Sequence, residues 1–183
     1  MDLAFALLCC ALLALERLTY AWAWNRPEAF SRRAAGSFGL PDDPVLALRR
    51  LFHGFKVVQV AVIVAWCQWF AGSWLPLPTA SLPWLVAAAA LVAVGQLLNV
   101  GVMHRLGTEG VFYGNRFGRD VPWVTGFPFS VCPHPQYLGA LATVWGVLLA
   151  MRFPNPDWIV LPLISSIYYV LGARLESRIP ARG

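Results

Sequence analysis

The chain has 183 residues, of which 58% are hydrophobic and 13% are charged, and its formal net charge is +5 at pH 7. Globular proteins contain about 45–50% apolar and about 25% charged residues, so this composition excludes an ordinary soluble domain. Because a membrane-spanning helix uses about 20 residues, little of the chain is left for a second domain. We expect one integral membrane domain over residues 1–183.

Five apolar segments follow one another along the chain, at residues 3–24, 51–71, 83–103, 135–151 and 158–175. The first ends in the aromatic residues typical of a membrane interface, but it carries Glu16 and Arg17, which interrupt the apolar core of a signal peptide. It therefore predicts a helix that spans the membrane or lies at its surface. Residues 152–157 contain two prolines and form the short link of a C-terminal helical hairpin. The fold class is all-α: a multi-pass helical membrane protein with four or five membrane-embedded helices.

The arginines predict the orientation of these helices. If the segments cross the membrane alternately, Arg152 is left on one side and eleven arginines lie on the other. By the positive-inside rule the basic side faces the cytosol. The eleven are Arg26, Arg32, Arg33, Arg49, Arg50, Arg105, Arg116, Arg119, Arg174, Arg178 and Arg182.

On the same side, residues 107–118 combine closely spaced glycines with basic and aromatic residues. Gly107, Gly110, Gly114 and Gly118 recur every three or four positions. On a helix they would form a stripe of small residues for packing, and in a loop they would allow a cofactor to approach the backbone. Arg116 and Arg119 are candidates for binding a phosphate or a carboxylate, whereas most other arginines are explained as anchors at the membrane surface.

Aromatic rings are concentrated around this segment. A ring face attracts a sulfonium or a methylated ammonium group by roughly 0.5–2 kcal/mol. An interfacial aromatic belt would require the same residues, so both interpretations remain open. The candidate rings are Tyr113, Trp123, Phe127, Phe129 and Tyr137.

Metal and disulfide sites are not expected. The four cysteines show no paired spacing, and three of them, Cys9, Cys10 and Cys67, lie in apolar segments where a thiol acts as a small hydrophobic group.

Six short motifs give the chain a resemblance to phospholipid N-methyltransferases, especially the short phosphatidyl-N-methylethanolamine N-methyltransferases of plants and algae. The motifs are GQLLN (95–99), GTEGVFYGNRFG (107–118), PWVT (122–125), FPF (127–129), PQYLG (135–139) and LES (175–177). The resemblance implies transfer of a methyl group from S-adenosyl-L-methionine to the amine of a phosphatidylethanolamine derivative, which leads to phosphatidylcholine. The family also implies an enzyme of the endoplasmic reticulum.

The resemblance also implies where the cofactor binds. The family uses a glycine pair in the third helix, of which Gly95 is matched here, and an acidic pair after the last helix, of which Glu176 is matched and Ser177 is not acidic. Together with the glycine-rich segment, the expected cofactor-binding residues are Gly95, Gly107, Gly110, Arg116, Glu176 and Ser177. The expected substrate-binding residues are Arg119, Trp123, Phe127 and Phe129.

The substrate ammonium must lose a proton before it attacks, and the sequence leaves several acceptors open. His134, Tyr137, Glu109 and water are the candidates. His134 would otherwise cap or orient a helix, Glu109 would be a solvated acid, and Glu176 would pair with Arg174 or Arg178. No serine or cysteine triad is needed, because methyl transfer depends on orientation and desolvation.

We expect the partners to be the membrane and a phospholipid that enters from the bilayer, with no nucleic acid. Two other functions remain open. An enzyme similar to isoprenylcysteine carboxyl methyltransferase would use the same cofactor, and a non-catalytic membrane scaffold would explain the helices but not the polar loop. The sequence does not decide the oligomeric state.

Overall fold

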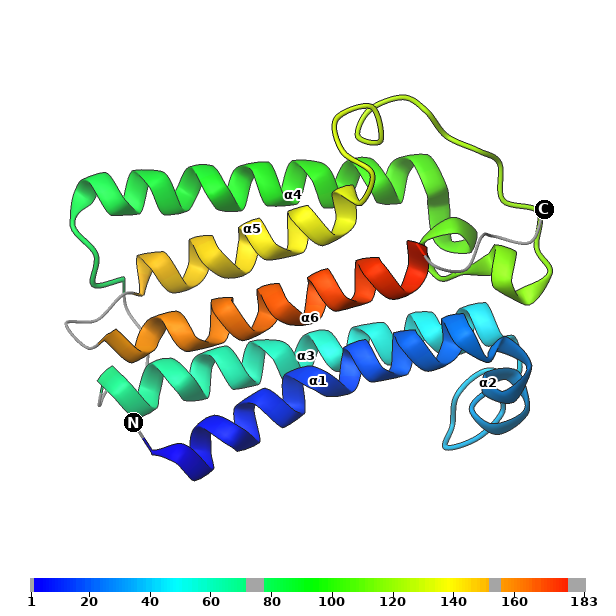
Figure 1. Cartoon of the computed structure of the whole chain (residues 1–183), viewed down its shortest axis with the longest axis horizontal. Coiled ribbons are helices and arrows are strands. Elements are labelled where there is room, and N and C mark those ends of the chain that lie inside the picture. Colours follow the sequence, from blue (N-terminus) through cyan, green and yellow to red (C-terminus); the bar gives the residue numbers. More distant parts are fainter. Residues whose placement is uncertain (1, 72–77, 152–155, 178–183) are drawn as a thin grey trace.

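The computed structural model describes residues 2–71, 78–151 and 156–177, and within these residues it contains helices and no strand. The five long helices lie side by side along one common direction (Figure 1), which confirms the predicted all-α class. The elements are α1 (Leu3–Asn25), α2 (Pro27–Arg33), α3 (Pro44–Ala71), α4 (Leu82–Val111), η1 (Gly114–Phe117), α5 (Pro135–Ala150), η2 (Pro156–Ile159) and α6 (Val160–Ser177).

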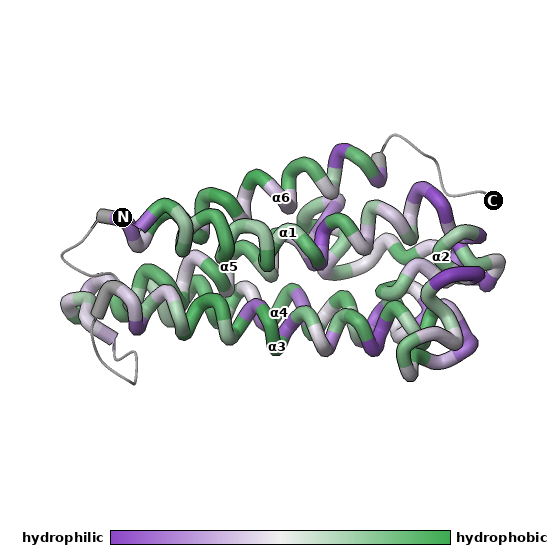
Figure 2. Tube along the Cα trace, turned by 90° about the horizontal axis from the view of Figure 1, so that it is seen from below, coloured by the Kyte–Doolittle hydropathy of each residue, from purple (hydrophilic) through white to green (hydrophobic). Residues whose placement is uncertain are grey.

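Four of the described helices, α1, α3, α4 and α6, are long and apolar enough to cross a membrane. The fifth, α5, has 16 residues. At a rise of about 1.5 Å per residue it is roughly 24 Å long, shorter than a hydrocarbon core of about 30 Å. Hydrophobic residues run along all five helices, and hydrophilic residues gather around α2 (Figure 2). The prediction of four or five membrane-embedded helices is confirmed.

Two helices extend further than the apolar pattern predicted. α3 begins at Pro44 rather than at residue 51, because the side chain of Asp43 accepts hydrogen bonds from the backbone N–H groups of Val45 (2.8 Å) and Leu46 (3.1 Å). α4 continues past residue 103 to Val111 and bends at Gly107, which adopts a φ of 60° that other residues rarely adopt. The first part of the predicted loop is therefore helical.

The helix α2 was missing from the sequence prediction. It has seven residues and begins with Pro27, whose fixed φ suits the first position of a helix. Three of its residues are arginine or glutamate, so it shows no apolar run of the kind that identified the long helices.

The helices α4 and α5 form the closest pair in the bundle, and glycines make that closeness possible. A methyl group on Gly95 would lie 2.5 Å from the backbone oxygen of Gly139, and one on Gly146 would lie 2.7 Å from the oxygen of Ala88. Small residues of this kind are typical of helix contacts in membranes. The predicted hairpin of α5 and α6 is present as well: Trp145 Nε1 donates to Ser166 Oγ at 3.0 Å across the pair. Most of its link, residues 152–155, lies outside the described residues.

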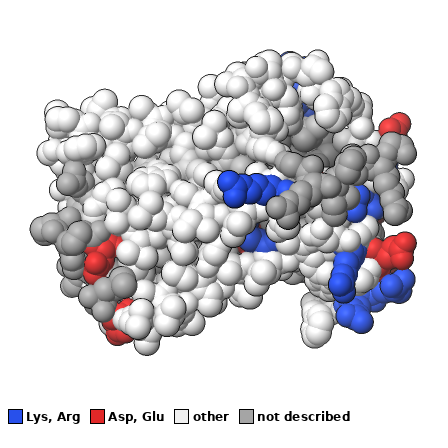
Figure 3. All heavy atoms as spheres, viewed as in Figure 1, with Lys and Arg blue, Asp and Glu red and all other residues white. Residues whose placement is uncertain are grey.

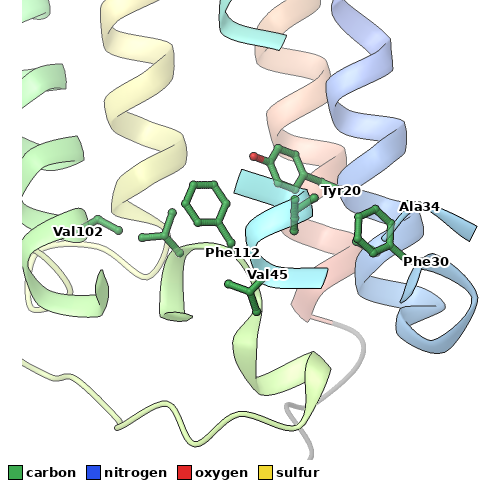
Figure 4. Close-up of a cluster of buried hydrophobic side chains, with 9 residues drawn as sticks. Tyr20, Phe30, Ala34, Val45, Val102 and Phe112 are labelled. Carbon is green, nitrogen blue, oxygen red and sulfur yellow. The ribbon is translucent and has the colours of Figure 1, made fainter. Parts of the chain in front are cut away.

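Two clusters of buried side chains hold the bundle together. One of them includes Cys9, Trp66 and Leu148. The other joins α1, α2, α3 and α4 through Tyr20, Phe30, Val45, Val102 and Phe112 (Figure 4). Because Phe112 directly follows α4 and lies two residues before η1, this second cluster fixes the position of the segment that follows α4.

Polar connections meet at one end of the bundle. The end of α1, α2, the start of α3, η1, the start of α5 and the end of α6 all lie there (Figure 1). On the face seen in the space-filling view, the visible basic side chains lie on that half of the molecule, while acidic side chains appear at both ends (Figure 3). The predicted clustering of arginines on one side therefore agrees with the fold for nine of the eleven; Arg178 and Arg182, like Arg152, lie outside the described residues.

Candidate functional site

The carboxylate of Glu176 is the centre of a polar cluster at this end of the bundle. Its Oε1 accepts hydrogen bonds from the hydroxyl groups of Tyr113 and Tyr137, and the two hydroxyl oxygens are 3.4 Å apart. Glu176 lies in the last turn of α6, Tyr137 in the first turn of α5, and Tyr113 between α4 and η1. Three segments predicted from the sequence to form one site thus meet in what we call the Glu176 cluster, namely Glu176, Tyr113 and Tyr137.

Local backbone geometry brings the two tyrosines to Glu176. Tyr113 adopts a left-handed conformation (φ 61°), an uncommon one that turns the chain sharply after α4. Its ring packs edge-on against Tyr20 (5.6 Å between centroids) and Trp24 (5.1 Å). Tyr137 stacks on His134, with ring centroids 5.7 Å apart and planes inclined by 13°. His134 therefore contacts the Glu176 cluster by stacking its ring on Tyr137. Within the described residues it forms no hydrogen bond with the Glu176 carboxylate.

The sequence prediction missed Arg17, which reaches the same place from α1. Its guanidinium lies over the rings of Tyr169 (4.3 Å), Tyr20 (4.9 Å) and Tyr137 (5.4 Å). In the sequence, Glu16 and Arg17 interrupt an apolar run and so argue against a signal peptide. The spacing of Arg17, Tyr20 and Trp24, at i, i+3 and i+7, would have placed them on one face of a helix, and ionisable groups within membrane helices are often functional.

A small cavity lies between α1, α5 and α6 beside the Glu176 cluster. It has a volume of about 10 Å³, which is room for about one water molecule. Its lining includes Arg17 and Trp24 from α1, Tyr137 from α5 and Glu176 from α6. The indole Nε1 of Trp24 is buried and has no hydrogen-bond partner among the described residues. The cavity therefore combines a cation, an unpaired donor and a carboxylate.

A wider hollow of about 360 Å³ lies between α2 and η1, at the surface of the basic end. Its lining includes Ser31 and Arg32 from α2, and Arg116 and Phe117 from η1. Arg116 connects it with the cavity: its Nε donates to the backbone oxygen of Trp24 at 3.0 Å, and its guanidinium lies 4.9 Å from the centre of the Trp24 ring. The predicted cofactor residue Arg116 thus lies between the two spaces.

Glu109 and Arg119 take part in a separate ion cluster. Arg119 Nη2 donates to the carboxylate of Asp43, and its Nε lies 3.9 Å from Glu109 Oε2. This cluster joins the end of α4 to the start of α3. Within the described residues, neither Glu109 nor Arg119 forms a hydrogen bond or ion pair with the Glu176 cluster.

The predicted glycines occupy different kinds of position. Gly95 lies in the contact between α4 and α5 described above, and Gly107 is at the bend of α4 with open space around its α-carbon. A methyl group on Gly110 would lie 2.7 Å from Cβ of Leu106. Ser177 is the last residue of α6, and its side chain lies outside the part of the chain that is described.

The remaining predicted rings lie on the loop between η1 and α5, and within the described residues they form no ring contact with Tyr113 or Tyr137. Trp123 is 89% exposed and Phe127 is 41% exposed. Arg105 Nε donates to the backbone oxygen of Phe127 at 3.2 Å, and Phe129 packs against the second buried cluster. Of the five rings named from the sequence, the structure brings Tyr113 and Tyr137 to Glu176.

Comparison with known proteins adds independent information. Residues 83–181 match the family described as phospholipid methyltransferase. This range contains every residue of the Glu176 cluster, whereas Arg17 and Trp24 precede it. No solved structure matches the chain.

Three relatives illustrate the similarity. The chain is 33% identical over 161 residues to phosphatidyl-N-methylethanolamine N-methyltransferase of Arabidopsis thaliana, which covers 87% of this chain and 84% of that protein. It is 33% identical over 104 residues to the protein of the same name from Saccharomyces cerevisiae, covering 54% of this chain and 50% of the relative. It is 30% identical over 88 residues to human phosphatidylethanolamine N-methyltransferase, covering 48% and 43%. The chain therefore belongs to the phospholipid methyltransferase family.

Proposed function

We propose that this protein transfers methyl groups from S-adenosyl-L-methionine to phosphatidyl-N-methylethanolamine and phosphatidyl-N,N-dimethylethanolamine, with phosphatidylcholine as the product. The observation that carries the proposal is the convergence of Tyr113, Tyr137 and Glu176 at the basic end of a membrane bundle. Membership of the family and the names of its relatives support the reaction and the lipid class.

The residues beside the cavity suit this cofactor chemically. A carboxylate such as Glu176 binds an amino group or ribose hydroxyls, the rings of Tyr113 and Tyr137 suit a cationic sulfonium, and the unpaired N–H of Trp24 suits an oxygen acceptor. Because the cavity has room for about one water molecule, the side chains at its rim must move when a larger ligand enters. The cofactor would supply an electrophilic methyl group.

The proposed cofactor-binding residues keep the set expected from the sequence, with roles adjusted to their positions. Glu176 and Arg116 would contact the cofactor directly. Gly107 and Gly110 would shape the end of α4, which leads to Arg116. For Gly95 we propose an indirect role, because its α-carbon is covered by α5. Ser177 remains a proposed neighbour of the cofactor.

The protein's own contribution to catalysis would be orientation, exclusion of water and removal of one proton. Tyr137 already donates its hydroxyl proton to Glu176. We place the proton acceptor there: as the amine nitrogen gives up its proton to the Tyr137 oxygen, the tyrosine passes its own proton to Glu176. His134, stacked on Tyr137, is the alternative acceptor. Glu109 is a third candidate for the proton acceptor, although its ion cluster with Arg119 is separate from the Glu176 cluster.

The whole chain would form one methyltransferase domain in the membrane of the endoplasmic reticulum, with the basic end in the cytosol. The phospholipid would enter from the bilayer, and its headgroup would meet the exposed loop that carries Trp123, Phe127 and Arg119.

Transfer of a labelled methyl group distinguishes this function from carboxyl methylation. Purified protein in nanodiscs would be given methyl-labelled S-adenosylmethionine with either ethanolamine lipids or a prenylated cysteine. An N-methyl group resists base, whereas a methyl ester releases methanol. Base-stable label in the lipid is expected, and base-labile label in the prenylcysteine alone would contradict the proposal. The variant Glu176→Gln, whose methyl-transfer rate should be strongly reduced, is the control.

A further inference from the structure

The α1 side of the cavity carries hydrogen-bond donors that take no part in the proton transfer proposed above. Arg17 and Trp24 both line it, two turns apart on one face of α1. Glu176 of α6, which is an acceptor, lines the same cavity. Both α1 residues precede the range that matches the family, residues 83–181, so the resemblance assigns them no role.

The indole N–H group of Trp24 has no hydrogen-bond acceptor among the described residues. The residue is 9% exposed, and its Nε1 is buried without a hydrogen-bond partner in the part of the chain that the structure describes. Most buried polar groups in proteins are paired, because an unpaired donor costs about 1–3 kcal/mol. The indole nitrogen can only donate, so the group that satisfies it must be an acceptor.

Arg17 adds a positive charge that its neighbours only partly neutralise. Its Nη2 donates to Glu16 Oε1 at 2.6 Å, but the same carboxylate oxygen lies 3.1 Å from Lys56 Nζ. Two cations therefore share one carboxylate, and Glu16 is 6% exposed. A guanidinium carries five N–H donors, and the single hydrogen bond to Glu16 uses one of them. Tyrosine rings cover other parts of the group without accepting its remaining hydrogen bonds.

We propose that Arg17 and Trp24 form an anion subsite, which binds the oxyanion of a zwitterionic ligand whose amine faces Glu176. Two donors from α1 and a carboxylate from α6 match a molecule that carries an anion and an amine a few atoms apart. The inference rests on the proposed function. Both ligands of that function, S-adenosylmethionine and the phospholipid, carry an anion and an amine. The oxyanion is either the carboxylate of S-adenosylmethionine or the phosphate of the lipid headgroup.

The decisive variant is Trp24→Phe, because it removes the N–H, keeps most of the ring and breaks no hydrogen bond of the side chain. Arg17→Met is the second variant; it keeps the apolar stem, and Glu16 retains Lys56 as its partner. Hydrogen bonds to charged groups typically correspond to about a tenfold to a hundredfold change in affinity. We expect the affinity for the ligand that carries the oxyanion to fall by roughly that factor in each variant.

Two measurements on purified protein in nanodiscs identify the source of the oxyanion. The dissociation constant is measured for S-adenosylmethionine and for its decarboxylated form, and the apparent KM is measured for the lipid. If the cofactor carboxylate binds here, the wild type prefers the complete cofactor and the variants lose this preference. If the lipid phosphate binds here, the lipid KM rises and cofactor affinity is unchanged.

Matched controls separate the subsite from general damage. Trp22→Phe makes the same change two residues earlier, where the ring packs on Phe30, and Lys56→Met removes the other cation paired with Glu16. Both should leave the two affinities near wild type. An active wild type with unchanged cofactor and lipid affinities in Trp24→Phe would overturn the subsite alone. A wild type that binds no cofactor and methylates no lipid would overturn the proposed function, and the subsite with it.

Discussion

The hydroxyl group of Tyr137, in the first turn of α5, donates a hydrogen bond to the carboxylate of Glu176, in the last turn of α6. The two residues are 39 positions apart in the chain. If they act as one unit, the variants Tyr137→Phe, Glu176→Gln and the double variant should not be additive. We expect a coupling energy of about 1–3 kcal/mol in the methyl-transfer rate, the usual range for residues in direct contact. The methyl-transfer rates of the wild type and the three variants are measured with purified protein. Additive effects would show that Tyr137 and Glu176 act independently.

Glu176→Gln tests the role of the charge in cofactor binding. The change removes the charge and keeps the shape of the side chain, so insertion into the membrane should be unaffected. Because a hydrogen bond to a charged group contributes about 1.5–3 kcal/mol, affinity for S-adenosylmethionine should fall roughly tenfold to a hundredfold. Calorimetry on purified protein measures it, and a dissociation constant equal to that of the wild type would remove Glu176 from the cofactor site.

Gly95→Ala tests whether this glycine is needed for helix packing. The new methyl group would lie 2.5 Å from both the Gly139 oxygen and Thr143 Oγ1, so α4 and α5 must separate. We expect a loss of about 1–3 kcal/mol of folding free energy, the usual cost of overpacking, seen as a lower midpoint of thermal unfolding in detergent.

Gly54→Ala is the matched control for this change. Gly54 lies in α3, and a methyl group added to it would have no neighbouring atom within 4 Å, so alanine there should leave stability unchanged or raise it by up to about 1 kcal/mol. Equal midpoints for the two variants would show that the α4–α5 contact tolerates a methyl group.

The orientation of the bundle is testable by cysteine labelling. In a variant without the native cysteines, single cysteines at Arg33 and Asp120 should react with an impermeant reagent from the cytosolic side, and one at Thr79, at the opposite end of α4, should not. Labelling of the Asp120 position from the luminal side alone would invert the topology. It would also place the Glu176 cluster away from a cytosolic cofactor.

The long helices were predictable because hydrophobic runs of about 20 residues leave few other structures in a membrane. Their ends were not, because these depend on local groups. Asp43 caps α3, which begins seven residues before the apolar run, and Gly107 lets α4 bend and continue. The short helix α2 lacks the apolar run that made the others visible.

The candidate site was predictable where a residue type is unusual for its surroundings. Glu176 stands at the end of an apolar helix, and Tyr137 follows a proline at the start of another. The partners of each residue depend on the fold: Trp123 is exposed, Arg119 pairs with Asp43, and Arg17 approaches Tyr137 from a helix more than 100 residues earlier. A sequence pattern within one segment carries no information about such contacts.

The substrate preference tests the central claim most directly. Aromatic rings favour partly methylated amines over a primary ammonium, because methyl groups reduce the hydration that is lost on binding. Purified protein in nanodiscs would be given methyl-labelled S-adenosylmethionine with phosphatidylethanolamine, its monomethyl derivative or its dimethyl derivative, and initial rates would be compared. We predict faster methylation of the monomethyl and dimethyl lipids, with phosphatidylcholine as the final labelled product. Equal or faster methylation of unmethylated phosphatidylethanolamine, or no label in any of the three lipids, would contradict the account.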